Sequence, residues 1–83
     1  MSTRKLSNVP IRDFKEFLTK YGCKHINTES GHEKWSKDGL MRPVIFQTQV
    51  EPVPEHIIKS NLRTLNCTKQ DFFNILFDVN ESQ

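Results

Sequence analysis

The apolar residues in the first quarter of the chain predict one amphipathic helix. They recur every three or four positions, a spacing that places them on one face of a helix. Pro10 suits the first turn, with Asn8 as the expected cap, and Gly22 suits the left-handed residue that ends a helix. The predicted buried stripe consists of Ile11, Phe14, Phe17 or Leu18, and Tyr21.

After Gly22 the helical period is replaced by three short stretches that are typical of strands. These stretches cover residues 23–28, 32–36 and 42–48, and turn signals separate them at residues 29–31 and 37–39. Short strands joined by Gly-containing turns favour antiparallel pairing of neighbours. We therefore expect a three-stranded antiparallel meander.

Two further helices are expected in the last third of the chain. A proline-rich connector over residues 50–54 precedes a second helix that runs from Pro54 to about Asn66. Thr68 and Asp71 have the spacing of a capping box and open a short third helix. The expected buried stripe of the second helix consists of Ile57 or Ile58, Leu62 and Leu65. The third helix is unusually apolar, with Phe72, Phe73, Ile75, Leu76 and Phe77.

The whole pattern predicts a single α+β domain over residues 1–83, in the order helix, three strands, helix, short helix. A chain of 83 residues is near the lower size limit for one hydrophobic core. We expect residues 1–8 and 78–83 to be loosely ordered, apart from Leu6, which can pack against the first helix. Helices cover one face of so small a sheet and leave the other open.

Charge and cysteine content narrow the function only slightly. The formal net charge is +2, but residues 1–48 carry nine Lys or Arg against five Asp or Glu, and residues 49–83 carry three against five. Cys23 and Cys67 match no thiol redox motif, so we expect both to be reduced. Without a transmembrane stretch or a signal peptide in the sequence, a cytoplasmic location is expected.

The alternation of side chains along the second predicted strand makes His32 a candidate functional residue. Because successive side chains point to opposite faces, burying Trp35 leaves His32 and Lys34 on the open face. On the first strand, burying Ile26 would bring His25 to the same face as His32.

An exposed histidine beside cations has a chemistry that suits RNA. Imidazole can take a proton from a hydroxyl near neutral pH, and cations can hold a phosphate. A ribose 2′-hydroxyl deprotonated in this way attacks the adjacent phosphate and cleaves the strand, whereas DNA lacks that nucleophile. Gly31, which has no β-carbon, allows a close backbone approach. The candidate phosphate contacts are Lys34, Lys24, Lys37 and Arg42.

Other interpretations of these residues remain open. An exposed histidine is often an ordinary surface residue, and lysines usually form a solvated face. Cys23, His25, His32 and Cys67 are conceivable metal ligands, but their spacing matches no structural zinc site, and we expect neither a metal nor another cofactor. A non-catalytic RNA-binding module and a protein-interaction domain both fit the same fold.

The motifs taken together resemble those of the HicA family of toxins. The resemblance covers residues 10–77, and its most specific part is the Gly31-His32-x-x-Trp35 pattern in register with the helix after the sheet. Supporting similarities are the helix that ends at Tyr21 and Gly22, and the segments 58–65 and 68–73.

This resemblance implies a fold like that of double-stranded RNA-binding domains and a ribonuclease that cleaves messenger RNA and arrests translation. It implies that His32 is catalytic, that Gly31 precedes it as the small residue, and that a HicB-type antitoxin covers the active site. Ser30 stands where the family commonly has glycine. The Pro54-x-His56 sequence lies later than a similar motif of the family, so His56 receives no role.

Overall fold

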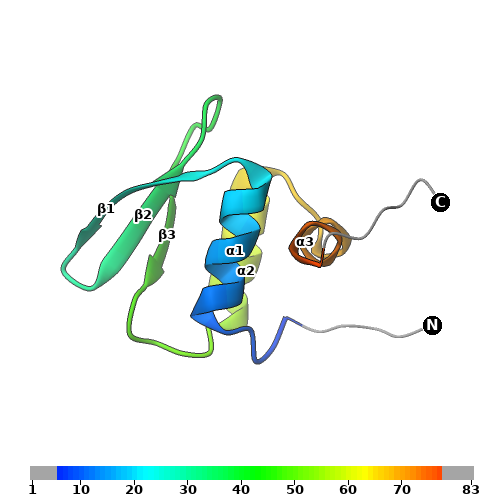
Figure 1. The fold of residues 1–83 in the computed structure, drawn as a ribbon, viewed down its shortest axis with the longest axis horizontal. Helices are drawn as coiled ribbons and strands as arrows, with labels where there is room; N and C mark the ends of the chain where they lie inside the picture. Colours follow the sequence, from blue (N-terminus) through cyan, green and yellow to red (C-terminus); the bar gives the residue numbers. More distant parts are fainter. Residues whose placement is uncertain (1–5, 78–83) are drawn as a thin grey trace.

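The computed structural model describes residues 6–77 and has three helices and a three-stranded antiparallel sheet (Figure 1). The small α+β class and the predicted order of elements are therefore confirmed. The third strand is shorter than the predicted segment 42–48. The elements are α1 (Ile11–Tyr21), β1 (Lys24–Glu29), β2 (His32–Ser36), β3 (Val44–Gln47), α2 (Glu55–Leu65) and α3 (Lys69–Leu76).

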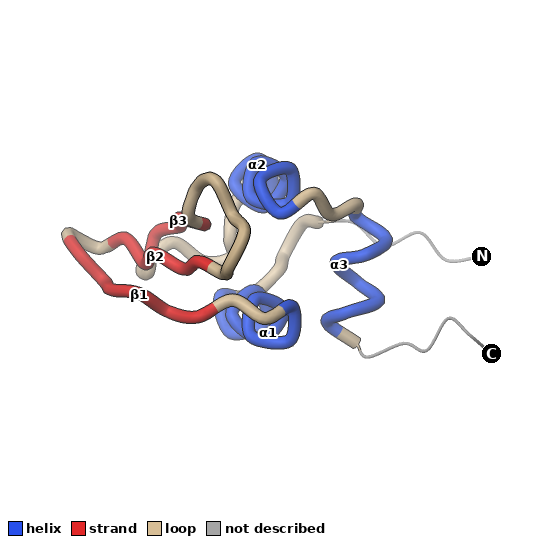
Figure 2. Tube along the Cα trace, turned by 90° about the horizontal axis from the view of Figure 1, so that it is seen from above, coloured by secondary structure: helices blue, strands red, loops and turns tan. Residues whose placement is uncertain are grey.

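The elements form three layers. The sheet has the order β1-β2-β3, and α1 and α2 lie between this sheet and α3 in both views (Figures 1 and 2). Val44 and Phe46 of β3 point into the core and are 0% and 2% exposed, as predicted. All six residues of β1 are exposed, so the helices cover the β3 side of the sheet more fully than the β1 edge.

Four phenylalanine rings join the layers. The Phe14 ring of α1 lies 5.1 Å from that of Phe46 in an edge-to-face arrangement and 6.4 Å from that of Phe72 in α3. The rings of Phe17 and Phe72 are 4.7 Å apart. All four are buried, and edge-to-face or tilted contacts of this kind add to the free energy gained from apolar burial.

The helix ends follow the predicted signals with one exception. Gly22 ends α1 with a φ of 105°, and Thr68 opens α3 with the predicted capping box. The prediction that Asn8 caps α1 is wrong, because the cap position is Pro10 and no side chain there accepts a hydrogen bond. The Ile11 amide donates instead to Glu51 Oε2 at 3.1 Å.

The segment before α1 is held by the core. Leu6 is buried and belongs to the hydrophobic core. The Val53 amide donates to the Val9 carbonyl at 2.8 Å, which ties this segment to the connector before α2. The remaining parts of the predicted loose ends, residues 1–5 and 78–83, lie outside the described residues.

A β-bulge changes the faces on which the β1 side chains lie. His25 is paired with Trp35, and Asn27 with Lys34, so Ile26 is the extra residue between two pairs. A bulge of this kind reverses the alternation of side chains beyond it. The prediction that Ile26 is buried is therefore wrong, since it is 54% exposed. The expectation that His25 lies beside His32 is also wrong.

One buried carboxylate links α1 to β2. Glu33 is 6% exposed and accepts a hydrogen bond from Trp35 Nε1 at 2.9 Å, while Lys15 Nζ lies 2.9 Å from its other oxygen. Burial acts to raise the pKa of Glu33, but the hydrogen bonds from Lys15 and Trp35 outweigh burial and leave this pKa below its usual value. The ionised carboxylate is therefore the form that the fold stabilises.

Glu33→Gln should lower the free energy of unfolding at pH 7 by about 1–3 kcal/mol, because Lys15 then loses its anionic partner. The folded-state pKa of Glu33 lies below the ordinary 4.5. Its stabilising effect is therefore present above about pH 4.5 and is lost as the pH falls through the folded-state value. The Tm measured between pH 7 and pH 3 should fall less steeply in the variant than in the wild type.

The control for this experiment is Glu29→Gln, which removes an exposed carboxylate from β1. It should change the free energy of unfolding by less than about 0.5 kcal/mol. Equal acid dependence of the Tm in the wild type and in Glu33→Gln would contradict the role assigned to Glu33.

Candidate functional site

His32 lies at the start of β2 on the open face of the sheet. It is exposed and is paired with Glu29 on β1 and Gln47 on β3. Trp35, three positions later, is buried on the other face. The predicted division of this strand into an anchored face and an open face is confirmed.

A backbone contact defines which nitrogen of His32 is free. His32 Nδ1 lies 3.2 Å from the carbonyl oxygen of Ser30. A carbonyl can only accept a hydrogen bond, so in the neutral imidazole this contact favours the tautomer with the proton on Nδ1 and the lone pair on Nε2. Nε2 has no protein partner within residues 6–77, and it can therefore act as a base towards a bound hydroxyl.

The two residues before His32 form a tight hairpin loop. Ser30 has a φ of 53° and Gly31 a φ of 78°, and positive φ at both positions is the requirement of a type I′ turn. The Gly31 carbonyl accepts hydrogen bonds from the Thr48 amide at 2.8 Å and from the Thr48 hydroxyl at 3.2 Å. A β-carbon on Gly31 would meet no atom within 4 Å, so the backbone angle is what requires glycine in this structure.

Only one of the predicted cations lies close to His32. Lys34 is the next residue on the same face of β2 and is partly buried, opposite Asn27 and Ile45. Lys24 is paired with Ser36. Because Ser36 is four residues beyond His32, Lys24 lies about 13 Å along the strand from it, at roughly 3.3 Å per residue.

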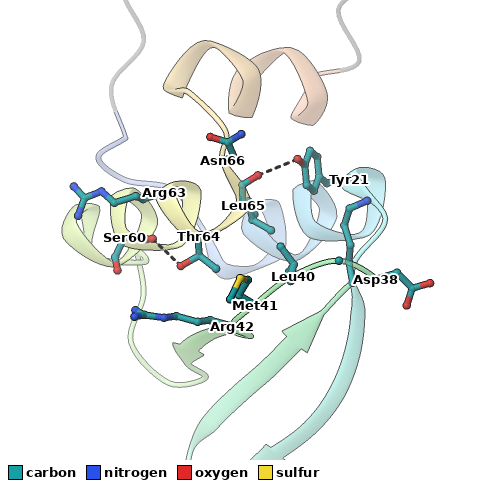
Figure 3. Close-up of a pocket in the computed structure, with 12 residues that line it drawn as sticks. Tyr21, Asp38, Leu40, Met41, Arg42, Ser60, Arg63, Thr64, Leu65 and Asn66 are labelled. Atoms are coloured by element: carbon teal, nitrogen blue, oxygen red, sulfur yellow. Dashed lines mark hydrogen bonds between the residues drawn. The ribbon is translucent and has the colours of Figure 1, made fainter.

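The other two predicted cations line a groove at the far end of β2. Lys37 and Arg42 belong to the loop between β2 and β3, and both line a cavity of about 620 Å³ that residues of α2 also line. Figure 3 shows Arg42 beside α2. Arg63 of α2 lines the same groove and was missed by the sequence analysis. The sequence contains one indication that Arg63 is available for a ligand. Lys59 lies four residues before Arg63 and Cys67 lies four residues after it, and neither is acidic. Arg63 therefore has no helical carboxylate partner at either spacing.

The side chains of Tyr21 and of the two cysteines have low reactivity at neutral pH. The Tyr21 hydroxyl donates to the Leu65 carbonyl at 3.0 Å, and the hydrogen bond with Cys67, together with burial, raises the pKa of Tyr21 to about 12. Burial also raises the pKa values of the Cys23 and Cys67 thiols. Both cysteines are free, and they are poor nucleophiles at neutral pH.

The remaining histidines lie away from His32. His25 Nε2 is 2.8 Å from the Thr28 hydroxyl, and its ring meets that of Trp35 edge-on at 5.6 Å between centroids. His56 is exposed in the first turn of α2. Across residues 6–77, no three His, Cys, Asp or Glu side chains are grouped as a metal ion would require.

Comparisons with known proteins were made for the whole chain and found no match. No protein-family model matches the chain, and no curated protein or solved structure matches it. Among the described residues, no helix has the length and apolar character needed to cross a membrane. The interpretation of this site therefore depends on its own geometry and on the motifs of the sequence.

Ser30→Gly should raise the free energy of unfolding by about 1 kcal/mol, because glycine adopts a positive φ without the steric cost that serine bears. Gly31→Ala should lower the same quantity by about 1–2 kcal/mol for the converse reason. Chemical denaturation of both variants tests these values. An unchanged stability in both would show that the loop does not hold the backbone angles described.

Proposed function

We propose that this protein is a metal-independent endoribonuclease, a toxin similar to those of the HicA family, with His32 as its general base. The observation that carries the proposal is the state of His32. Its Nδ1 donates to the Ser30 carbonyl, and its Nε2 faces solvent on an open sheet surface beside Lys34. A fixed tautomer with a free basic nitrogen is the arrangement that proton abstraction requires.

The proposed reaction transfers one proton and exchanges one bond at phosphorus. His32 Nε2 takes the proton of a ribose 2′-hydroxyl, and the resulting oxygen attacks the adjacent phosphorus. The bond from phosphorus to the 5′-oxygen of the next nucleotide breaks, and that oxygen takes up a proton, which the imidazolium or water can supply. The products are a 2′,3′-cyclic phosphate and a 5′-hydroxyl.

The proposal is supported by one cation close to His32 and by others further from it. Lys34 shares the face and strand of His32 and is placed to contact the phosphate that is attacked. Lys24, Lys37 and Arg42 lie towards the other end of β2 and would contact phosphates further along the strand. Gly31 and Ser30 fix the loop that presents the imidazole.

The arrangement of elements supports a fold like that of double-stranded RNA-binding domains. These domains likewise have a helix, an antiparallel three-stranded meander and a second helix in sequence, and α3 is then an addition. We also propose messenger RNA as the substrate and a HicB-type antitoxin as the partner. This partner would cover the open face around His32 and block access to RNA.

Replacement of His32 by alanine should abolish cleavage of RNA and growth arrest on expression, with a loss of at least 100-fold in rate. The side chain is exposed, so the far-ultraviolet circular dichroism and the Tm should remain those of the wild type. His56→Ala is the matched control, because it removes an exposed histidine on α2 and should leave cleavage unchanged. Fragments with cyclic phosphate ends are the readout.

Two results would favour the alternative functions. Binding of labelled RNA without any fragments from the wild type would indicate a non-catalytic RNA-binding module. Absence of an RNA affinity that weakens with salt would indicate a protein-interaction domain, since phosphate contacts must weaken as salt rises. Full toxicity of His32→Ala would remove His32 from the mechanism.

Cleavage by the wild type should persist at an unchanged rate in excess EDTA, because the proposed proton transfer and attack involve only protein side chains and the RNA. The measurement is the initial rate on a labelled RNA with and without chelator, at constant ionic strength. A rate that falls with EDTA and returns with Mg²⁺ would contradict the proposed mechanism.

A further inference from the structure

The groove between the β2–β3 loop and α2 gathers cations from separate parts of the chain. Arg42 and Lys37 come from the loop, and Arg63 comes from the last turn of α2. The side chains of Arg42 and Arg63 extend towards the same side of α2, and Ser60 lies between them (Figure 3). This set of four residues is called the basic groove below.

The charges of the basic groove have no carboxylate partner within residues 6–77. The ion pairs in that part of the chain join Arg12, Lys15, Lys20 and Lys59 to acidic side chains, and none involves the three cations of the groove. Lys37 instead lies 5.2 Å from the centre of the Tyr21 ring. Three cations without an acidic partner in residues 6–77 line one cavity, and such a cavity favours an anionic ligand.

Negative charge near the groove is weaker than the positive charge. Asp38 also lines the cavity, but its carboxylate points away from the arginines (Figure 3). The C-terminal ends of α1 and α2 also meet the groove, and each contributes about half a negative charge. One aspartate and two helix ends amount to roughly two negative charges against three positive ones, so the groove remains basic.

The groove also offers contacts that suit a nucleotide better than a free phosphate ion. Met41 is 95% exposed beside Arg42 and presents an adaptable apolar side chain for a base. The Ser60 hydroxyl has no hydrogen-bond partner in the described part of the chain, residues 6–77, and Ser60 lies between the two arginines (Figure 3). The groove lies beyond Ser36, more than about 13 Å of strand from His32, so one strand of RNA can occupy both places with several nucleotides between them.

We infer that the basic groove binds backbone phosphates of the substrate RNA strand several nucleotides away from the bond that is cleaved. The inference rests on the proposed function, and it adds Arg63 and Ser60 to the residues that hold the substrate. The groove contacts phosphate and not the 2′-hydroxyl, so it should bind DNA as well as RNA, whereas the reaction at His32 requires RNA.

The experiment measures binding of a fluorescent single-stranded DNA 12-mer, a probe that cannot be cleaved, by anisotropy over a range of salt. Arg42→Gln/Arg63→Gln should weaken binding at 50 mM salt by about 10-fold or more and reduce the slope of log affinity against log salt by about 1.4, or 0.7 for each phosphate contact. Arg12→Gln/Lys69→Gln removes the same charge elsewhere, from exposed residues of α1 and α3, and should weaken binding less than about 3-fold.

Equal losses in the two double variants, or no binding of the probe by the wild type, would overturn the groove inference. A separate measurement of RNA cleavage tests the proposed function. A wild type that binds through the groove without producing fragments supports the groove and contradicts the ribonuclease. If the wild type cleaves RNA and Arg42→Gln/Arg63→Gln cleaves it with the same KM, the proposed ribonuclease is supported and the groove inference is contradicted.

Discussion

Phe14 is the residue on which the assembly of the three layers depends. Its ring meets Phe46 of the sheet on one side and Phe72 of α3 on the other, and it is fully buried. A small sheet can bury only one face against helices, and these rings decide which face that is. The exposed position of His32 is therefore a consequence of packing several residues away.

The same packing separates the candidate site into two regions. The open sheet face carries His32 and Lys34, and its hairpin loop controls the imidazole through a backbone carbonyl. The loop after β2 places further cations against α2. In the function proposed above, the base at one end of the strand and the positive charge at the other would be contacted by one long, flexible polyanion, because only a chain can reach both ends at once.

Local signals predicted much of the fold and part of the candidate site. Strand parity placed Trp35 inside and His32 outside, and the Thr68 capping box and the Gly22 helix end depend only on nearby residues. The features that were missed depend on distant residues. Glu51 reaches the start of α1 across 40 positions, and Arg63 joins a loop more than 20 residues before it. The bulge at Ile26 depends on the register of β2 against β1, which the alternation within β1 alone does not determine.

That bulge has a further consequence for the behaviour of the protein at high concentration. β1 is an edge strand with both faces exposed, and such strands can pair with other copies and aggregate. The extra residue at Ile26 divides its regular backbone into a two-residue and a three-residue stretch. Neither stretch offers an incoming strand enough consecutive hydrogen bonds to pair firmly. The irregularity that keeps His25 and His32 on different faces should thus also make the β1 edge a poorer template for pairing with another copy of the protein.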